Sequence, residues 1–175
     1  MARSTEAGRT RVGKPGTVRP GTPRILNTPG NIVLQRGKGI VRWPVDTRRV
    51  RRWTIAALEM PVSLVVRLVD EPEALALNRQ WGGRDAACNV LTFAYGPAGQ
   101  AEALADVVVC LPVVERECGE RRIGLAAHLA HLVVHGVLHA QGYTHDDDEA
   151  ALRMESREAS ILARFGFASP YPDGS

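Results

Sequence analysis

Several features that would assign the chain to a membrane or secreted class are missing from its 175 residues. No apolar run approaches the ~20 residues that a membrane-spanning helix needs, so we expect no membrane partner. The N-terminus has no short apolar segment of the secretory type, and three cysteines, Cys88, Cys110 and Cys118, cannot all pair with one another. These absences predict a reducing, cytoplasmic setting.

Common nucleotide and nucleic-acid motifs are missing as well. The sequence has no internal repeat, no phosphate-binding glycine loop and no helix pair of the kind that reads DNA. None of the cysteines has C-x-x-C spacing, so we interpret them as small, buried or half-buried side chains. We therefore expect no DNA partner.

Charge and composition divide the chain into an extension and one domain. Residues 1–30 are rich in Gly, Pro, Thr and Arg and carry a net charge of +5, against −2 for residues 31–175. Without hydrophobic periodicity, residues 1–30 are expected to be a disordered basic extension, dispensable or translated from a misplaced start codon. A transit peptide is disfavoured because Pro and Gly disrupt the amphipathic helix that it needs. One domain is expected over residues 31–171, with a short tail at 172–175.

Hydrophobic patterning predicts four strands and about five helices in this domain. The strands are expected at residues 31–35, 63–70, 89–96 and 105–112. Helices are expected after a cap at Asp46 or Thr47, from Asp70 through Gln80, over residues 111–120 and 123–140, and from Asp146 to Gly166. Asp146 with Glu149 is interpreted as a capping box for the last helix.

Arginine is clustered in two places. The clusters are Arg42, Arg48, Arg49, Arg51 and Arg52, and then Arg121 with Arg122. Such runs usually form a solvated face, and phosphate binding is the alternative that stays open.

All five histidines lie in the 18 residues from 128 to 145. On a helix, the first four share an arc of about 80°, because steps of three and four residues return to the same face. His135 and His139, one turn apart, are placed to bind one ion. Gly142 is expected to end the helix, because glycine accepts the left-handed conformation of a cap, and the reversed chain returns His145.

The resulting motif HGVLHAQGYTH offers three imidazoles, from His135, His139 and His145. Neutral imidazoles suit Zn²⁺, and three protein ligands leave the open position of a catalytic site. The alternative is a helix with buried, satisfied histidines. His128 lies roughly 16 Å along the axis from His139, too far for a ligand. His131 either supports the site, by hydrogen bonding or by lining the groove, or has a plain core or surface role.

Residues 31–171 resemble the YbeY family of rRNA-maturing bacterial endoribonucleases. The markers are LN at 77–78, NVLTF at 89–93, ADVVVC at 105–110, AAHLAHLVVHGVLHAQGYTH at 126–145 and GFASPY at 166–171. The resemblance implies an α+β fold in which a mixed four-stranded sheet is packed by helices, with a metal cleft built on the histidine helix. It also implies that His135, His139 and His145 bind one zinc ion per chain.

The same resemblance implies a single-strand-specific endoribonuclease that matures the 3′ end of small-subunit ribosomal RNA and acts in ribosome quality control. Its partners would be single-stranded RNA and ribosomal RNA or the small ribosomal subunit. Beyond the water that a bound metal activates, no catalytic residue is assigned.

Three positions depart from the family pattern. Gly82 stands in WGGRD where an arginine is usual, and Arg84, two residues on, is the candidate RNA contact in its place. Thr144 replaces the usual Asp beside the third histidine, and Cys88 replaces a Thr.

Two other functions fit parts of the pattern. A zinc peptidase of the metzincin type shares H-x3-H-x2-G-x2-H, but its general base is a Glu after the first histidine, where this chain has Gly136. A non-catalytic, zinc-stabilised, ribosome-associated module is favoured by the departures at Gly82 and Thr144.

Overall fold

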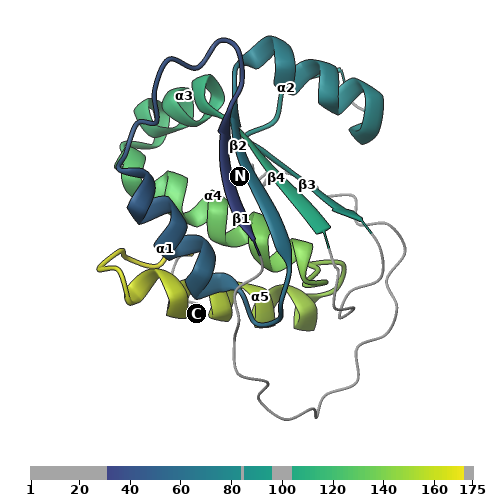
Figure 1. The fold of residues 1–175 in the computed structure, drawn as a ribbon. Helices are drawn as coiled ribbons and strands as arrows, with labels where there is room; N and C mark the ends of the chain where they lie inside the picture. The colour runs from purple at the N-terminus through teal and green to yellow at the C-terminus, as the bar shows by residue number, and fades with distance from the viewer. Residues whose placement is uncertain (1–30, 84, 96–103, 172–175) are drawn as a thin grey trace, which may run out of the picture.

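The computed structural model describes residues 31–83, 85–95 and 104–171 (Figure 1). The extension expected at 1–30, the tail expected at 172–175 and Arg84 lie outside the described residues. No helix in the described ranges is both long enough and apolar enough to cross a membrane.

Four strands, five α-helices and one π-helical turn make up the described part of the chain. In order, they are β1 (Ile32–Arg36), α1 (Thr47–Ala57), β2 (Ser63–Val69), α2 (Glu71–Leu77), the π-helical turn η1 (Asn78–Gly82), β3 (Val90–Tyr95), β4 (Leu104–Cys110), α3 (Leu111–Arg121), α4 (Leu125–Ala140) and α5 (Asp148–Ala163).

The strands form one mixed sheet in the order β1-β2-β4-β3. β1 is parallel to β2, and β2 is parallel to β4, whereas β3 is antiparallel to β4. Each parallel pair is joined by a crossover that contains a helix, as parallel strands require. The α+β class and the mixed four-stranded sheet are confirmed.

Aspartates fix where three of the helices begin. The Asp46 carboxylate accepts a hydrogen bond from the Arg48 amide at 2.8 Å, and Asp70 caps α2 in the same manner. In α5, Asp147 accepts from the Ala150 amide at 2.7 Å. The capping box expected from Asp146 and Glu149 is therefore wrong. With Asp147 as the cap, Glu149 lies one position before the place where a capping-box glutamate reaches back.

The helix expected through Gln80 also ends differently. α2 stops at Leu77, and the chain continues as the turn η1 before Gly83 adopts a left-handed φ of +67°. The hydrogen bonds of η1 join residues five apart and widen the last turn. Hydrophobic periodicity alone does not indicate such a turn.

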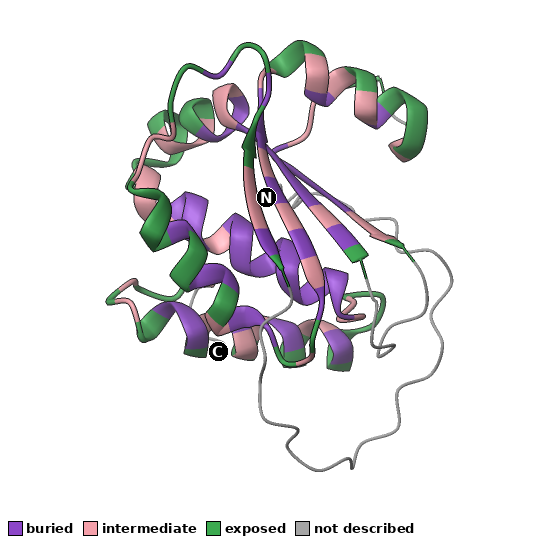
Figure 2. Cartoon of the chain, viewed as in Figure 1, coloured by how far each residue is buried: buried purple, intermediate pink, exposed green. Residues whose placement is uncertain are grey.

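Alternate residues of β4 enter two separate hydrophobic clusters, one on each face of the sheet. Val107 and Val109 join the larger cluster with α1, α4 and α5, while Val108 and Cys110 join a smaller one with α2 and α3. α4 packs against β3 and β4 of the sheet and against the helices α1 and α5, so it is buried along most of its length (Figure 2). The histidine helix is thus a rigid, central element.

Candidate metal centre

The histidines of α4 form a continuous row along one side of the helix. Successive ring centroids from His128 to His131, His135 and His139 are 6.3, 6.0 and 4.4 Å apart. The predicted arc of histidines therefore exists.

The chain returns after α4 as the glycine pattern predicts. Gly142 has a φ of +95°, which glycine adopts without strain. His145 then lies with its ring centroid 5.0 Å from that of His139 and 6.1 Å from that of His135. His135 and His139 are buried, whereas His145 is exposed. The structure thus brings these three side chains together, with one edge of the group toward solvent.

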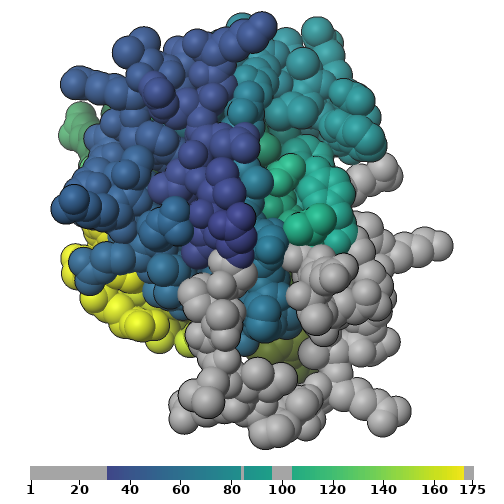
Figure 3. Space-filling model, in the orientation of Figure 1, coloured from purple at the N-terminus to yellow at the C-terminus, as the bar shows by residue number. Residues whose placement is uncertain are grey.

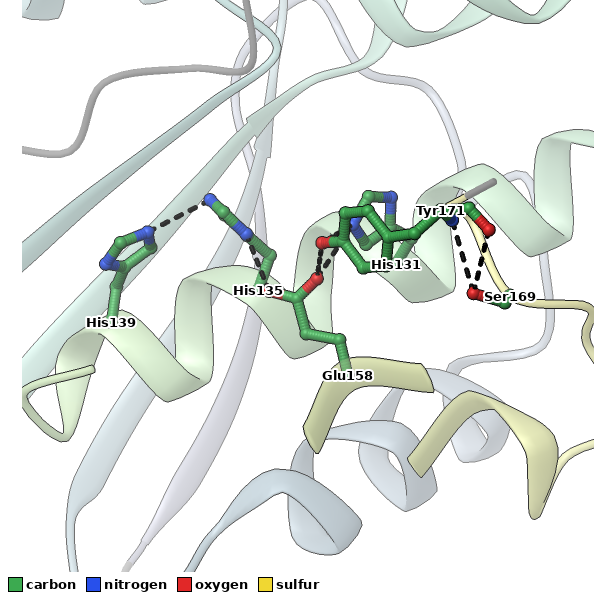
Figure 4. A network of polar contacts seen from close by, with 6 residues as sticks. All are labelled: His131, His135, His139, Glu158, Ser169 and Tyr171. Atoms are coloured by element: carbon green, nitrogen blue, oxygen red, sulfur yellow. Dashed lines mark hydrogen bonds and ion pairs between the residues drawn. The ribbon is translucent and has the colours of Figure 1, made fainter. Parts of the chain in front are cut away.

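The ring nitrogens of His135 and His139 have different partners on their two sides. Nδ1 of His135 lies 2.8 Å from a carboxylate oxygen of Glu158 (Figure 4). Nδ1 of His139 lies 2.8 Å from the carbonyl oxygen of Tyr143. Both partners are acceptors, so each Nδ1 carries the proton and donates. In a neutral imidazole, Nε2 is then left with its lone pair.

Those two Nε2 atoms lie 3.0 Å from one another. Two lone pairs at this separation repel unless a cation or proton lies between them. A tetrahedral zinc ion with Zn–N bonds of 2.0–2.1 Å separates two ligand nitrogens by about 3.3 Å. The arrangement of His135 and His139 therefore fits an ion of this kind.

Burial sets the charge state of His139, and hydrogen bonds set that of Glu158. The pKa of His139 falls to about 3, because burial and the neighbouring rings of His135 and His145 disfavour its protonated form. Burial raises the pKa of Glu158, but hydrogen bonds from His131 and His135 outweigh it and bring the value to about 2. A neutral imidazole and an ionised carboxylate are the forms that metal binding needs.

Glu158 was not among the site residues that the sequence predicts. It lies on α5, is fully buried, and accepts hydrogen bonds from His135, from His131 at 3.0 Å and from the hydroxyl of Tyr171 (Figure 4). The sequence does contain a signal for Glu158, because its spacing from Met154 and Ile161 puts it on the buried face of an amphipathic helix. Buried acidic side chains are paired or bind metals.

His131, His135 and Glu158 also offer one ligand atom each within 4.8 Å, so these residues could hold a metal ion as well. Here His131 uses Nε2 toward Glu158, and both carboxylate oxygens already accept hydrogen bonds. Of the two roles left open for His131, hydrogen-bonded support describes its contacts.

His128 lies at the other end of the row. Its Nε2 lies 2.6 Å from the Glu117 carboxylate, which also accepts from the side-chain amide of Asn89 at 3.2 Å. His128 thus has a separate partner on α3 and lies apart from the group of three.

Gly136 and Gly82, which depart from the metzincin and YbeY patterns respectively, both lie too close to neighbouring side chains for a Cβ to fit without a shift. A Cβ at Gly136 would lie 2.5 Å from a methyl carbon of Val107, so α4 contacts the sheet too closely for the glutamate of a metzincin peptidase. A Cβ at Gly82 would lie 1.8 Å from the side-chain oxygen of Asn78, whose amide donates to the Ala86 carbonyl at 2.6 Å. An arginine at position 82 requires Asn78 to move.

The fold and the site together define a class of protein: an α+β domain with a cluster of histidines and a carboxylate that could hold a metal ion. The family model for endoribonuclease YbeY matches residues 44–166. The endoribonuclease YbeY of Cupriavidus pinatubonensis is 47% identical over 88% of this chain and 76% of its own length. That of Thiobacillus denitrificans is 53% identical over 70% of this chain and 84% of its own. The chain therefore belongs to the YbeY family of endoribonucleases, which are RNA-cleaving hydrolases, and the resemblance in its sequence is confirmed.

A solved structure supports the fold independently. The solution structure of the Thermotoga maritima protein TM1509 aligns with a TM-score of 0.52 and 23% sequence identity, over 82% of this chain and 98% of that one. The two proteins share their fold.

Proposed function

We propose that this protein is a zinc-dependent endoribonuclease that cleaves single-stranded RNA and matures the 3′ end of small-subunit ribosomal RNA in the cytoplasm. The observation that carries the metal part is the approach of the Nε2 atoms of His135 and His139 to 3.0 Å while both Nδ1 atoms are held by acceptors. Membership of the YbeY family supports RNA as the substrate. Ribosomal RNA or the small ribosomal subunit is the partner that the sequence resemblance implies.

His135, His139 and His145 are the proposed ligands of one zinc ion per chain. Glu158 orients the ring of His135 and fixes its proton on Nδ1, and the Tyr143 carbonyl does the same for His139. When bound, zinc would polarise a phosphate oxygen and lower the pKa of a coordinated water to about 7. The chain supplies the orientation and the neutral nitrogens for that chemistry.

The exposed position of His145 favours a catalytic centre over a purely structural one. His135 and His139 close the group on the side of the core, and His145 leaves the opposite side open to a substrate. Glu158 faces the Nδ1 nitrogen of His135, on the other side of the ring from Nε2, so it does not complete a fourfold shell around that nitrogen. An open fourth position is characteristic of catalytic zinc.

Cleavage assays with controlled metal content test this proposal. The purified protein should cut a single-stranded RNA that carries the 3′ end of small-subunit ribosomal RNA with its unprocessed extension. Chelation should abolish the cleavage, and added zinc should restore it. A scrambled sequence of equal length is the control for site selection. Cleavage that survives complete chelation would refute the metal dependence, and equal cutting of the scrambled RNA would refute the assignment to ribosomal RNA.

A further inference from the structure

A groove between the edge strand β1 and helix α1 is lined by basic and aromatic side chains that are not part of the metal centre. Trp43, Arg48, Arg51, Arg52 and Ile55 line it, together with residues of β1. α1 and β1 lie beside each other on the face shown in Figure 3. The groove has a volume of about 680 Å³, within the range of about 300–1,000 Å³ that ligand pockets occupy.

The charge around this groove is strongly one-sided. Residues 31–58 contain seven basic side chains and one acidic one, whereas residues 59–175 contain nine basic and seventeen acidic ones. Among the described residues, no ion pair joins Arg48, Arg49, Arg51 or Arg52 to a carboxylate. The positive charge of this surface is therefore not neutralised within the described part of the domain.

The position of the arginines is unfavourable for α1 itself. Four of them lie in the first six residues of the helix, where the Asp46 carboxylate caps the end but no acidic residue occupies the first turn. The N-terminal end of a helix carries partial positive charge, so basic residues there destabilise it and a bound anion stabilises it. This arrangement is consistent with a negatively charged ligand.

The groove favours a single nucleic-acid strand over an added peptide strand. Arg51 donates a hydrogen bond at 3.0 Å to the Ile32 carbonyl, whereas the carbonyl of Asn31, one residue earlier, pairs with Leu64 of β2. The outward carbonyl of Ile32 is thus already occupied, which limits the addition of another strand to this edge. Trp43 beside three arginines supplies the aromatic surface and positive charge with which proteins bind single-stranded nucleic acid.

The far end of α1 connects this surface with the metal centre. The Ala57 carbonyl accepts a hydrogen bond at 2.8 Å from the side chain of Gln141, which lies two residues after His139. Arg48 and Arg52 are nine and five residues before Ala57, or roughly 14 and 8 Å along the helix axis. A strand of several nucleotides spans that separation.

We infer that the groove between β1 and α1 is a second RNA-binding surface, which holds the phosphates and one or more bases of a single strand at a distance from the metal centre. The inference takes RNA as the ligand from the proposed function. Its prediction is that a long single strand binds more tightly than a short one, and that the added affinity depends on the arginines of α1.

Binding of a 16-nucleotide 2′-O-methyl oligouridylate to the zinc-loaded full chain tests the groove, with the RNA checked for integrity afterwards. In the double variant Arg48→Gln with Arg52→Gln, affinity at low salt should fall by roughly tenfold or more. The slope of log K against log salt should become shallower by about 1.4, since each single-strand phosphate contact contributes about 0.7. The matched control is Arg116→Gln with Arg153→Gln, which removes the same charge from α3 and α5 and should change affinity less than about twofold.

Equal losses of RNA affinity in the two double variants would overturn the assignment of the groove as an RNA-binding surface, because they would reflect net charge alone. Binding of polyglutamate as tight as that of the RNA would overturn RNA as the occupant. A dinucleotide substrate, whose single phosphate is the one that is cleaved and which leaves no phosphate for the groove, should be cleaved equally by the Arg48 and Arg52 variant and by wild type. Loss of that cleavage would assign the arginines to the centre instead. If the variant loses binding while wild-type protein cleaves no RNA, the groove stands and the proposed function fails.

Discussion

Of the histidine–carboxylate pairs on helix α4, the pairs of His128 and His135 use opposite nitrogens of the imidazole ring. Near its N-terminal end, His128 directs Nε2 toward Glu117, and Asn89 holds the same carboxylate. Two turns later, His135 directs Nδ1 toward Glu158. The two pairs have nearly equal distances of 2.6 and 2.8 Å, yet only the second leaves Nε2 directed toward another histidine.

This difference separates supporting histidines from candidate ligands. His128 and His131 both direct Nε2 toward a carboxylate, while His135 and His139 direct Nδ1 toward an acceptor. Spacing along the helix puts all four on one side, so spacing alone does not assign their roles. The roles differ according to which ring nitrogen of each histidine contacts its carboxylate or carbonyl partner.

The largest expected effect comes from removing a proposed ligand. His139→Ala should reduce zinc content from about one ion per chain to almost none, because two imidazoles rarely hold Zn²⁺ firmly. His128→Ala should keep its zinc, since Glu117 and not the metal is its partner. Metal analysis after gel filtration measures both. Stoichiometric zinc in the His139 variant would remove that residue from the ligand set.

A smaller effect is expected when each carboxylate becomes an amide. Glu158→Gln should weaken zinc affinity by roughly 10- to 100-fold, the usual cost of losing a partner that orients a ligand. Glu117→Gln makes the same chemical change in the other pair and should leave zinc affinity unchanged. Competition with a chromophoric chelator gives both affinities. Equal weakening in the two variants would mean that the carboxylates act through general stability.

The smallest expected effect is on stability. Burial raises the pKa of Glu117, but the hydrogen bonds from His128 and Asn89 outweigh it, so the pKa is lowered in the folded protein. Its contribution is therefore present above the unfolded pKa of about 4.3 and is lost as pH falls through the lower folded value.

Glu117→Gln should consequently lower the free energy of unfolding by about 1 kcal/mol at pH 7. Urea unfolding at several pH values measures this. The difference between variant and wild type should shrink as the pH falls below about 4.3. A difference that stays constant through that range would show that Glu117 is not stabilised as an anion.

The elements and the histidine cluster were predictable because their signals are local. The β-branched content of SLVVRLV and the 3.6-residue period of the histidines decide strand and helix without knowledge of the rest of the fold. Gly142 and His145 follow from the same local geometry. The mixed character of the sheet came from the family resemblance. The strand order and the pairing were not predicted, because they depend on contacts between distant segments.

The carboxylates of the site were harder to predict. Glu158 lies 23 residues after His135 on another helix, and Glu117 precedes His128 by 11 residues on α3. Such pairs form only when helices pack, so spacing marks Glu158 as an acid on the buried face of α5 but does not show which histidines it contacts. Asp146 and Asp147 are adjacent, and the capping-box spacing favours Asp146 whereas the structure uses Asp147 as the cap. The domain limits at 31–171 and the role of Arg84 stay predictions.

Anomalous diffraction at the zinc edge, from crystals of the zinc-loaded protein, tests the assignment of ring nitrogens most directly. We predict one peak about 2.0–2.1 Å from Nε2 of His135, Nε2 of His139 and one ring nitrogen of His145, with Glu158 still bound to Nδ1 of His135. A peak between His131, His135 and the Glu158 carboxylate, with no density near His139, would contradict the assignment.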